Sequence, residues 1–170
     1  MNAKSFVVIA HDIRSCLNIG SLLRTADGLG VDKLYLTGYT PYPLSNHDDR
    51  LPHQAQKIHN QIHKSALGAE DIVNWVHESD VHKVIKKLKD QGYEIFALEQ
   101  SAKSIDLRQL TPPQKIALLL GREVEGIDSE LLDECNQIIE IPMRGKKESY
   151  NVVQAFAMAG YQIRFGQFVK

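Results

Sequence analysis

Apolar residues recur along the chain with two different spacings, and these predict strands that alternate with helices. Continuous or alternating apolar runs are typical of strands, and they occur at residues 5–11, 32–38, 73–77, 93–100, 115–121 and 137–143. Apolar residues three to four positions apart are typical of amphipathic helices, and they occur at residues 18–29, 54–65, 80–91, 129–135 and 152–165. This order predicts one α/β domain over residues 1–170 with about five or six mostly parallel strands flanked by helices.

Details of the pattern place some of these elements. Residues 115–121 (KIALLLG) form the most apolar run, which predicts a central strand buried on both faces. Asn18 is expected to cap the first helix and Ser149 the last, because their side chains can accept a hydrogen bond from a free backbone N–H. Gly30 suits the left-handed position that follows a helix. Residues 39–52 hold three prolines and predict a long surface loop.

Composition restricts the class of protein. A chain of 170 residues with 43% hydrophobic and 24% charged residues is typical of one globular domain. No apolar run approaches the 18 or so residues of a membrane helix, and the apolar run near the N-terminus is too short for a secretory signal. Two cysteines, Cys16 and Cys135, make no disulfide framework. We therefore expect a cytoplasmic protein with reduced thiols. Its net charge of −1 means that a polyanionic partner would need a local basic patch.

Several common site motifs are missing. The His59 and His63 pair in HNQIH lacks the glutamate of zinc hydrolases, so we expect no metal. Ser149 is not part of a G-x-S-x-G elbow. The chain has neither the GxGxxG turn of dinucleotide-binding domains nor a GxxxxGK[ST] phosphate loop.

Three polar clusters remain, and each has a simple structural explanation when taken alone. Asn18 and Arg24 flank a helix in NIGSLLRTADGLG, which is compatible with a cap and a solvated side chain. LLLGREVEG ends the most apolar strand and reads as a turn. IPMRGKKESYNVV joins the last strand to the last helix through a polar, basic loop. Ligands in open α/β sheets gather at the carboxyl ends of strands, and all three clusters lie at or near such ends. Together they predict a single site.

In their order and distances these clusters resemble the three sequence motifs of the SpoU-type (TrmH-like) RNA ribose 2′-O-methyltransferases of the SPOUT superfamily. The first motif is an Asn followed six residues later by an Arg, as in Asn18 and Arg24. The second is a strand that ends in Gly-x-Glu-x-x-Gly, as in GREVEG. The third is Ile-Pro-Met, a basic glycine loop and Ser-x-Asn-Val, as in IPMRGKKESYNV. The resemblance covers nearly the whole chain. Tyr150 departs from it, since the family more often has Leu there.

The resemblance implies a fold and an activity that the pattern alone does not. It implies an S-adenosylmethionine site within a deep trefoil knot formed by the C-terminal third, and a homodimer with the active site near the subunit interface. Physical argument alone predicts an unknotted sheet, because knots are very rare. The implied reaction transfers a methyl group to a ribose 2′-hydroxyl of RNA.

The resemblance also implies roles for particular residues. The implied catalytic residues are Arg24, Asn18, Glu123, Ser149 and Asn151. The implied cofactor-binding residues are Leu98, Glu99, Gly121, Ile141, Met143, Ser149 and Tyr150. Basic residues in adjoining loops are expected to hold RNA phosphates, and these are Arg14, Arg122, Arg144, Lys146 and Lys147. Arg24 is either a transient base or an electrostatic stabiliser, because a guanidinium is normally always protonated.

The substrate stays open at this point. Both tRNA and rRNA fit, with tRNA slightly favoured because a small dimer has little surface for a large substrate. The modified nucleotide is not indicated by the sequence. Two other classes are compatible with parts of the pattern: a non-catalytic RNA- or cofactor-binding protein of the same fold, and a nucleotide-binding metabolic enzyme with an ordinary doubly wound sheet.

Overall fold

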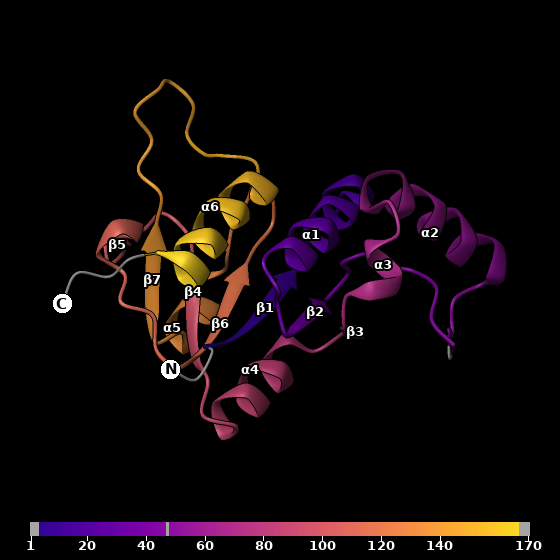
Figure 1. Ribbon diagram of the computed structural model, residues 1–170, viewed down its shortest axis with the longest axis horizontal. Helices are drawn as coiled ribbons and strands as arrows, with labels where there is room; N and C mark the ends of the chain where they lie inside the picture. The colour runs from indigo at the N-terminus through magenta and orange to yellow at the C-terminus, as the bar shows by residue number, and fades with distance from the viewer. Residues whose placement is uncertain (1–3, 47, 167–170) are drawn as a thin grey trace.

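The computed structural model describes residues 4–46 and 48–166, and its centre is a seven-stranded sheet (Figure 1). Every pairing between neighbouring strands is parallel, and the strand order is β3-β2-β1-β6-β4-β7-β5. The strands are β1 (Ser5–His11), β2 (Lys33–Thr37), β3 (Trp75–Glu78), β4 (Glu94–Leu98), β5 (Ile105–Asp106), β6 (Lys115–Leu120) and β7 (Gln137–Glu140). The helices are α1 (Cys16–Gly28), α2 (Pro52–Ala66), α3 (Ala69–Ile72), α4 (Val81–Asp90), α5 (Ser129–Glu134), α6 (Val152–Phe165) and the 3-10 turn η1 (Leu107–Gln109).

The sheet is covered on both faces, as its apolar strands require. Alternate residues of β1 point to opposite sides: Phe6 and Val8 join a core with α1, α2 and α6, whereas Val7 and Ile9 join a core with α4 and α5. Figure 1 shows these two layers of helices on either side of the sheet. The predicted α/β class with a mostly parallel sheet is confirmed, and β6 is the middle strand, as its composition predicted.

The structure corrects several details of the predicted elements. The sheet has seven strands and not five or six, because β5 pairs only two residues with β7 and leaves no periodic pattern in the sequence. The last strand ends at Glu140, before Pro142, which has no N–H to donate. α2 is longer than predicted, since Pro52 opens it at a position where its missing N–H costs nothing.

Both predicted helix caps were wrong by a few residues. α1 begins at Cys16, and the hydroxyl of Ser15 accepts from Asn18 N at 3.2 Å, so Ser15 is the N-cap. α6 is capped by the Asn151 side chain, which accepts from Val153 N at 2.9 Å, and not by Ser149. Both chosen residues lie within three positions of the actual cap, and only the backbone path decides which side chain faces the free N–H groups. Gly30 does adopt the expected left-handed conformation (φ +61°).

Two other features bear on the predictions. No helix in residues 4–46 or 48–166 is long and apolar enough to cross a membrane. The trefoil knot and the extent of a single domain over residues 1–170 stay predictions.

Candidate active site

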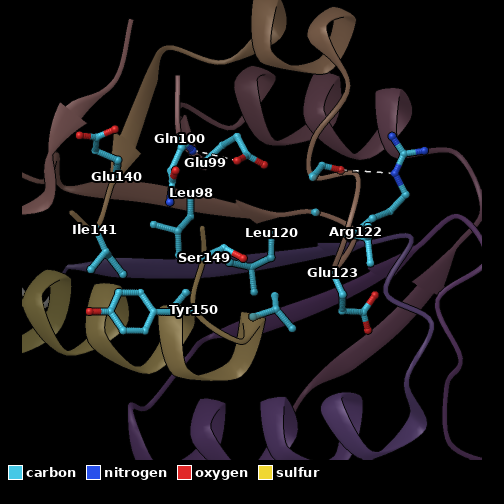
Figure 2. A pocket seen from close by; sticks show the side chains of 15 residues that line it. Leu98, Glu99, Gln100, Leu120, Arg122, Glu123, Glu140, Ile141, Ser149 and Tyr150 are labelled. Carbon is cyan, nitrogen blue, oxygen red and sulfur yellow. Dashed lines mark hydrogen bonds between the residues drawn. The ribbon is translucent and has the colours of Figure 1, made fainter. Parts of the chain in front are cut away.

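An open pocket of about 690 Å³ lies where the carboxyl ends of β4, β6 and β7 meet the start of α6 (Figure 2). Its walls mix apolar side chains with backbone and carboxyl groups, a composition typical of small-molecule sites. The lining residues are Leu98, Glu99, Gln100, Leu120, Gly121, Arg122, Glu123, Val124, Gly126, Glu140, Ile141, Ser149, Tyr150, Val152 and Ala155. The pocket therefore gathers the second and third sequence motifs and the end of β4 into one place.

Most of the residues expected to bind the cofactor lie in this lining. Leu98, Glu99, Gly121, Ile141, Ser149 and Tyr150 all do. Met143 is the exception. It is half-buried in the loop after β7 and does not line the pocket. Figure 2 shows Leu98, Leu120 and Ile141 along one wall and Tyr150 at the start of α6.

The turn after β6 packs tightly against the end of β4. A Cβ on Gly121 would lie 2.4 Å from Ile127 Cγ1 and 2.8 Å from the backbone carbon of Gly126, so only glycine fits there. The Glu99 carboxylate accepts hydrogen bonds from Ile127 N at 3.1 Å and from Gln100 N at 2.8 Å. Glu99 therefore contributes to the pocket as an anchor of the turn.

Glu123 connects the second motif to the first. Its carboxylate accepts from Arg14 N at 3.3 Å, Ser15 N at 3.2 Å and Asn18 Nδ2 at 3.1 Å. Figure 2 shows the Glu123 side chain on the opposite side of the turn from Arg122. Partial burial alone would raise the pKa of Glu123, but hydrogen bonds from its own backbone, from Arg14, from Asn18 and from Ser15 outweigh it and lower the pKa. Glu123 is thus a carboxylate held at the N-terminus of α1.

Asn18 extends this connection to the third motif. Asn151 Nδ2 donates to Asn18 Oδ1 at 3.3 Å, while Asn151 Oδ1 caps α6. Glu123, Asn18 and Asn151 therefore form a continuous hydrogen-bonded chain, which we call the anchored set. It joins the ends of two helices to the turn after β6, and residues more than 100 positions apart meet in it.

Arg24 is not brought to this pocket. It lies six residues after Asn18 on α1, its side chain is exposed, and it is not part of the pocket lining. The family resemblance also implies that Glu123 orients Arg24 or the loop. Within this chain the hydrogen-bond partners of the Glu123 carboxylate are Arg14, Ser15 and Asn18. The Arg24 side chain makes no hydrogen bond or ion pair with the residues in 4–46 and 48–166.

The basic residues fall into two groups. Arg144, Lys146 and Lys147 are exposed in the loop between β7 and α6, which projects beyond the strand ends in Figure 1. Arg14 pairs with Glu125 at 3.4 Å, and Arg122 pairs with Asp128, so these two are already engaged. The five residues all surround the same edge of the sheet, but only Arg122 lines the pocket.

Sequence reasoning missed some residues of the site. Gln100, Leu120, Glu140, Val152 and Ala155 also line the pocket, and their only sequence signal is their position beside predicted strand ends. Gln100 further holds the projecting loop, because its Nε2 donates to Glu148 O at 2.6 Å. As for metals, residues 4–46 and 48–166 contain no cluster of three His, Cys, Asp or Glu side chains able to hold one.

Comparisons with known proteins agree with this arrangement. The family model described as the SpoU rRNA Methylase family matches residues 5–161. A protein of Staphylococcus aureus (strain MSSA476) assigned to the TrmH family of tRNA/rRNA methyltransferases is 28% identical over 159 residues, 94% of this chain and 58% of that protein. A tRNA (guanosine(18)-2′-O)-methyltransferase of Borreliella burgdorferi is 26% identical over 155 residues, 91% of this chain and 64% of that protein.

A solved structure shows the same fold. The AdoMet-bound rRNA methyltransferase from Sinorhizobium meliloti superimposes with a TM-score of 0.80 at 22% identity, over 97% of this chain and 57% of that one. This chain thus spans less than two thirds of the length of each of these three proteins. Because the family model covers nearly all of the sequence and all three motifs, the chain belongs to the SpoU rRNA Methylase family.

Proposed function

We propose that this protein transfers a methyl group from S-adenosylmethionine to a ribose 2′-hydroxyl of RNA. The observation that carries the proposal is the pocket at the ends of β4, β6 and β7, into which the motifs of an RNA methyltransferase family converge. A relative from Borreliella burgdorferi is named for 2′-O-methylation of tRNA, and a solved relative holds AdoMet. A non-catalytic protein of the same fold is the alternative that the experiment below separates.

The pocket fits this cofactor in size and chemistry. Leu98, Leu120 and Ile141 supply apolar walls for an adenine ring, and backbone groups at the strand ends are available for its polar edge. The carboxylates of Glu99, Glu123 and Glu140 favour a ligand with a positive charge. When bound, S-adenosylmethionine supplies an electrophilic methyl group on a cationic sulfur.

The anchored set positions the site for this reaction. Because Glu123 binds the N-terminus of α1 and Asn18 is bonded to Asn151, the start of α6, which lines the pocket, is linked to α1 and to the turn after β6. Rigid placement of this kind contributes to rate by holding reacting groups in line. Ser149 lies in the pocket wall with an exposed hydroxyl, where it can contact cofactor or ribose.

Arg24 has two candidate roles in the reaction, and both require its guanidinium group. It either removes the proton of the 2′-hydroxyl, helped by a nearby RNA phosphate, or stabilises the developing negative charge on that oxygen. The second role is energetically easier, because a guanidinium group in a protein is normally a hydrogen-bond donor only. In either role it must reach a pocket that it does not line within one chain.

A second copy of the chain would solve this problem. Leu17 lies seven residues before Arg24, so the two share a face of α1, and Leu17 is 54% exposed. On neighbouring α6, Met158, Tyr161 and Phe165 share another exposed face, and Tyr161 and Phe165 are in ring contact at 5.2 Å. We infer that these apolar faces form a homodimer interface. Arg24 would then lie at that interface, close to the partner's pocket.

RNA would be held by the basic loop. Arg144, Lys146 and Lys147 are exposed beside the pocket mouth, and phosphate contacts of this type dominate nucleic-acid affinity. We favour tRNA over rRNA as the substrate, because the relative from Borreliella burgdorferi is named as a tRNA 2′-O-methyltransferase.

The proposal is tested by incubating the protein with labelled S-adenosylmethionine and total RNA from a strain that lacks it, followed by nucleoside analysis. We expect a new 2′-O-methylated nucleoside in one RNA size class. Cofactor binding is measured in parallel by calorimetry. Binding without transfer to any RNA would favour the non-catalytic alternative, and absence of both would refute the proposal.

A substitution in the pocket links that result to the proposed site. Gly121→Ala should abolish cofactor binding, because the new Cβ would clash with Ile127 and the Gly126 backbone. Gly145→Ala is the matched control, since a Cβ at Gly145 meets nothing within 4 Å. Equal cofactor affinity in the two variants would place the cofactor elsewhere.

A further inference from the structure

A second cavity of about 950 Å³ lies on the same edge of the sheet, at the carboxyl ends of β1, β2 and β3. It is lined by His11, Asp12, Tyr39, Asp80, His82, Asp128 and several smaller residues. None of these residues belongs to the three motifs. The ion pair between Arg122, which lines the first pocket, and Asp128 connects the two cavities.

Tyr39 stands at the rim of this cavity with 51% of its surface exposed. Arg14 lies over the Tyr39 ring, with its Cζ 5.7 Å from the ring centroid. The Arg14 backbone N–H donates to the Glu123 carboxylate at 3.3 Å. The aromatic ring is therefore separated from the anchored set by a single residue.

The backbone at Tyr39 is held in place by contacts with Asp12. Its backbone N–H donates to Asp12 Oδ1 at 3.0 Å. A Cβ on the preceding Gly38, which has a φ of +66°, would lie 1.9 Å from that same oxygen. Asp12 itself has a φ of +55° and pairs with His11 Nε2 at 3.3 Å. An exposed aromatic side chain on so constrained a backbone is ready to bind without prior ordering.

The charges of the cavity favour the base of a nucleotide over its phosphate. Asp12, Asp80, Asp128 and Glu130 line it, and these carboxylates would repel a phosphate. Carboxylate oxygens are good acceptors for the amino groups of cytosine, adenine and guanine. Two histidines, His11 and His82, also line the cavity, and Arg122 pairs with Asp128 on the side of the first pocket. Arg14 lies at the rim, with 68% of its side chain exposed. The interior thus suits a base edge and the rim suits the backbone.

We propose that Tyr39 and Arg14 form a stacking platform for one unpaired RNA base with an exocyclic amino group, whose edge enters the acidic cavity while its neighbour occupies the methyl-transfer site. Unpaired bases are commonly recognised by stacking on aromatic rings and guanidinium planes, with hydrogen bonds to their edges. The inference rests on the proposed function, and it adds a base-reading subsite that the methyl-transfer site does not include.

The test measures RNA binding directly, without S-adenosylmethionine, by fluorescence anisotropy with total tRNA and with short single-stranded oligonucleotides. Tyr39→Ala should weaken binding roughly tenfold, since stacking of one base on an aromatic ring is of that order. Tyr39→Phe keeps the ring and should bind within about twofold of the unchanged protein, whereas Tyr39→Leu should resemble Tyr39→Ala. Lys86→Ala is the control, because Lys86 is an exposed lysine of α4, on the other face of the sheet from α1 and α6.

The outcomes separate this inference from the proposed function. Equal RNA affinity for Tyr39→Ala and the unchanged protein would overturn the platform, even if methyl transfer is found. Equal loss in Tyr39→Phe and Tyr39→Ala would overturn stacking, because the hydroxyl would then be the important group. Equal affinity for oligouridine and oligocytidine would overturn recognition of an amino group. Calorimetry with S-adenosylmethionine should give unchanged binding for every Tyr39 variant, and a loss there would also contradict a subsite for RNA alone.

Discussion

The polar residues of the site divide into an anchored set and an exposed set. Glu123, Asn18 and Asn151 are linked by hydrogen bonds and hold the ends of α1 and α6. Arg24, Arg144, Lys146 and Lys147 are exposed, and their side chains have no hydrogen bond or ion pair among residues 4–46 and 48–166. Both sets come from the same three motifs. The motifs therefore contain residues that hold the structure together and residues that are free to contact a partner.

The difference suggests which contacts fix the side chains of each set in position. The anchored set is organised within one chain, which suits the binding of a small cofactor to a preformed pocket. The exposed set is all cationic, and it would acquire fixed positions from an RNA or from a second copy of the chain. Substitutions in the two sets should therefore differ in what they change: stability for the first, and turnover or RNA affinity for the second.

The largest effect is expected at Arg24. Arg24→Lys keeps the charge but loses the planar fork, and we expect turnover to fall at least about 100-fold, the size seen when one donor to a developing charge is removed. The free energy of unfolding should hardly change, because the side chain is exposed. Steady-state methyl transfer and thermal unfolding check both statements, with Arg108→Lys as a control. Near-normal turnover would contradict both roles suggested for this residue.

Mixing two variants sharpens this prediction. If Arg24 serves the partner's pocket, equal amounts of Arg24→Ala and Gly121→Ala subunits should exchange to recover roughly a quarter of full activity, since one heterodimer pocket has both residues intact. No recovery, with heterodimers shown by mass spectrometry, would place Arg24 in the pocket of its own chain.

A smaller effect is expected in the basic loop. Replacing Lys146 and Lys147 by alanine should weaken RNA binding roughly tenfold and lower the slope of log affinity against log salt by about 1–2. The matched control is Lys86 and Lys87, two adjacent exposed lysines of α4 on the other face of the sheet. A slope that falls equally in both double variants would mean that the charge acts at long range and not by contact.

Glu123 should affect stability and its pH dependence. Glu123→Gln should lower the free energy of unfolding by about 1 kcal/mol at pH 7, because charged hydrogen bonds at the N-terminus of α1 are weakened. The pKa of this carboxyl is lowered by folding, so its stabilisation is present above its ordinary pKa of 4.5 and is lost as pH falls through the folded value. Denaturation at several pH values should show the two proteins converging progressively as the pH falls below 4.5.

Glu125→Gln is the control for that series. Glu125 makes only an exposed ion pair with Arg14, and such pairs contribute little. A gap between Glu123→Gln and the unchanged protein that stays constant as the pH falls below 4.5 would show that shape, and not charge, is responsible.

The smallest effect compares two neighbouring residues. Asn151→Ala removes the cap of α6 and should cost on the order of 0.5–1 kcal/mol. Ser149→Ala removes no cap and should leave the free energy of unfolding unchanged, while it can alter cofactor affinity. Equal destabilisation by the two substitutions would contradict the observed capping.

The sequence was sufficient to predict the elements that depend on apolar periodicity. The central position of β6 follows from its uninterrupted apolar run, and the parallel pairing of β1 with β2 follows from the short helix between them. The choice of Ser149 over Asn151 as a cap failed, because capping depends on backbone direction over two residues. β5 was missed because two paired residues carry no pattern.

The site was predictable only where residues carry a motif. Glu123 was expected to orient Arg24 or the loop, but its contact with the backbone of Ser15 depends on how two helices and a turn meet in space. The second cavity was not predicted at all. His11, Asp12, Tyr39, Asp80 and His82 are individually ordinary, and only the parallel alignment of β1, β2 and β3 brings them together.

The pairing of β1 with β6 has a consequence for how the chain folds. The middle of the sheet joins residues 5–10 to residues 115–120, so β1 must wait for a strand that follows more than 100 residues later in the chain. Such distant pairing slows folding, and it leaves apolar strand edges open until the loop closes. During synthesis, the segment from β1 to β3 would leave the ribosome with one side of β1 unpaired. Correct folding of these strands during production should therefore be sensitive to growth temperature and chaperone supply.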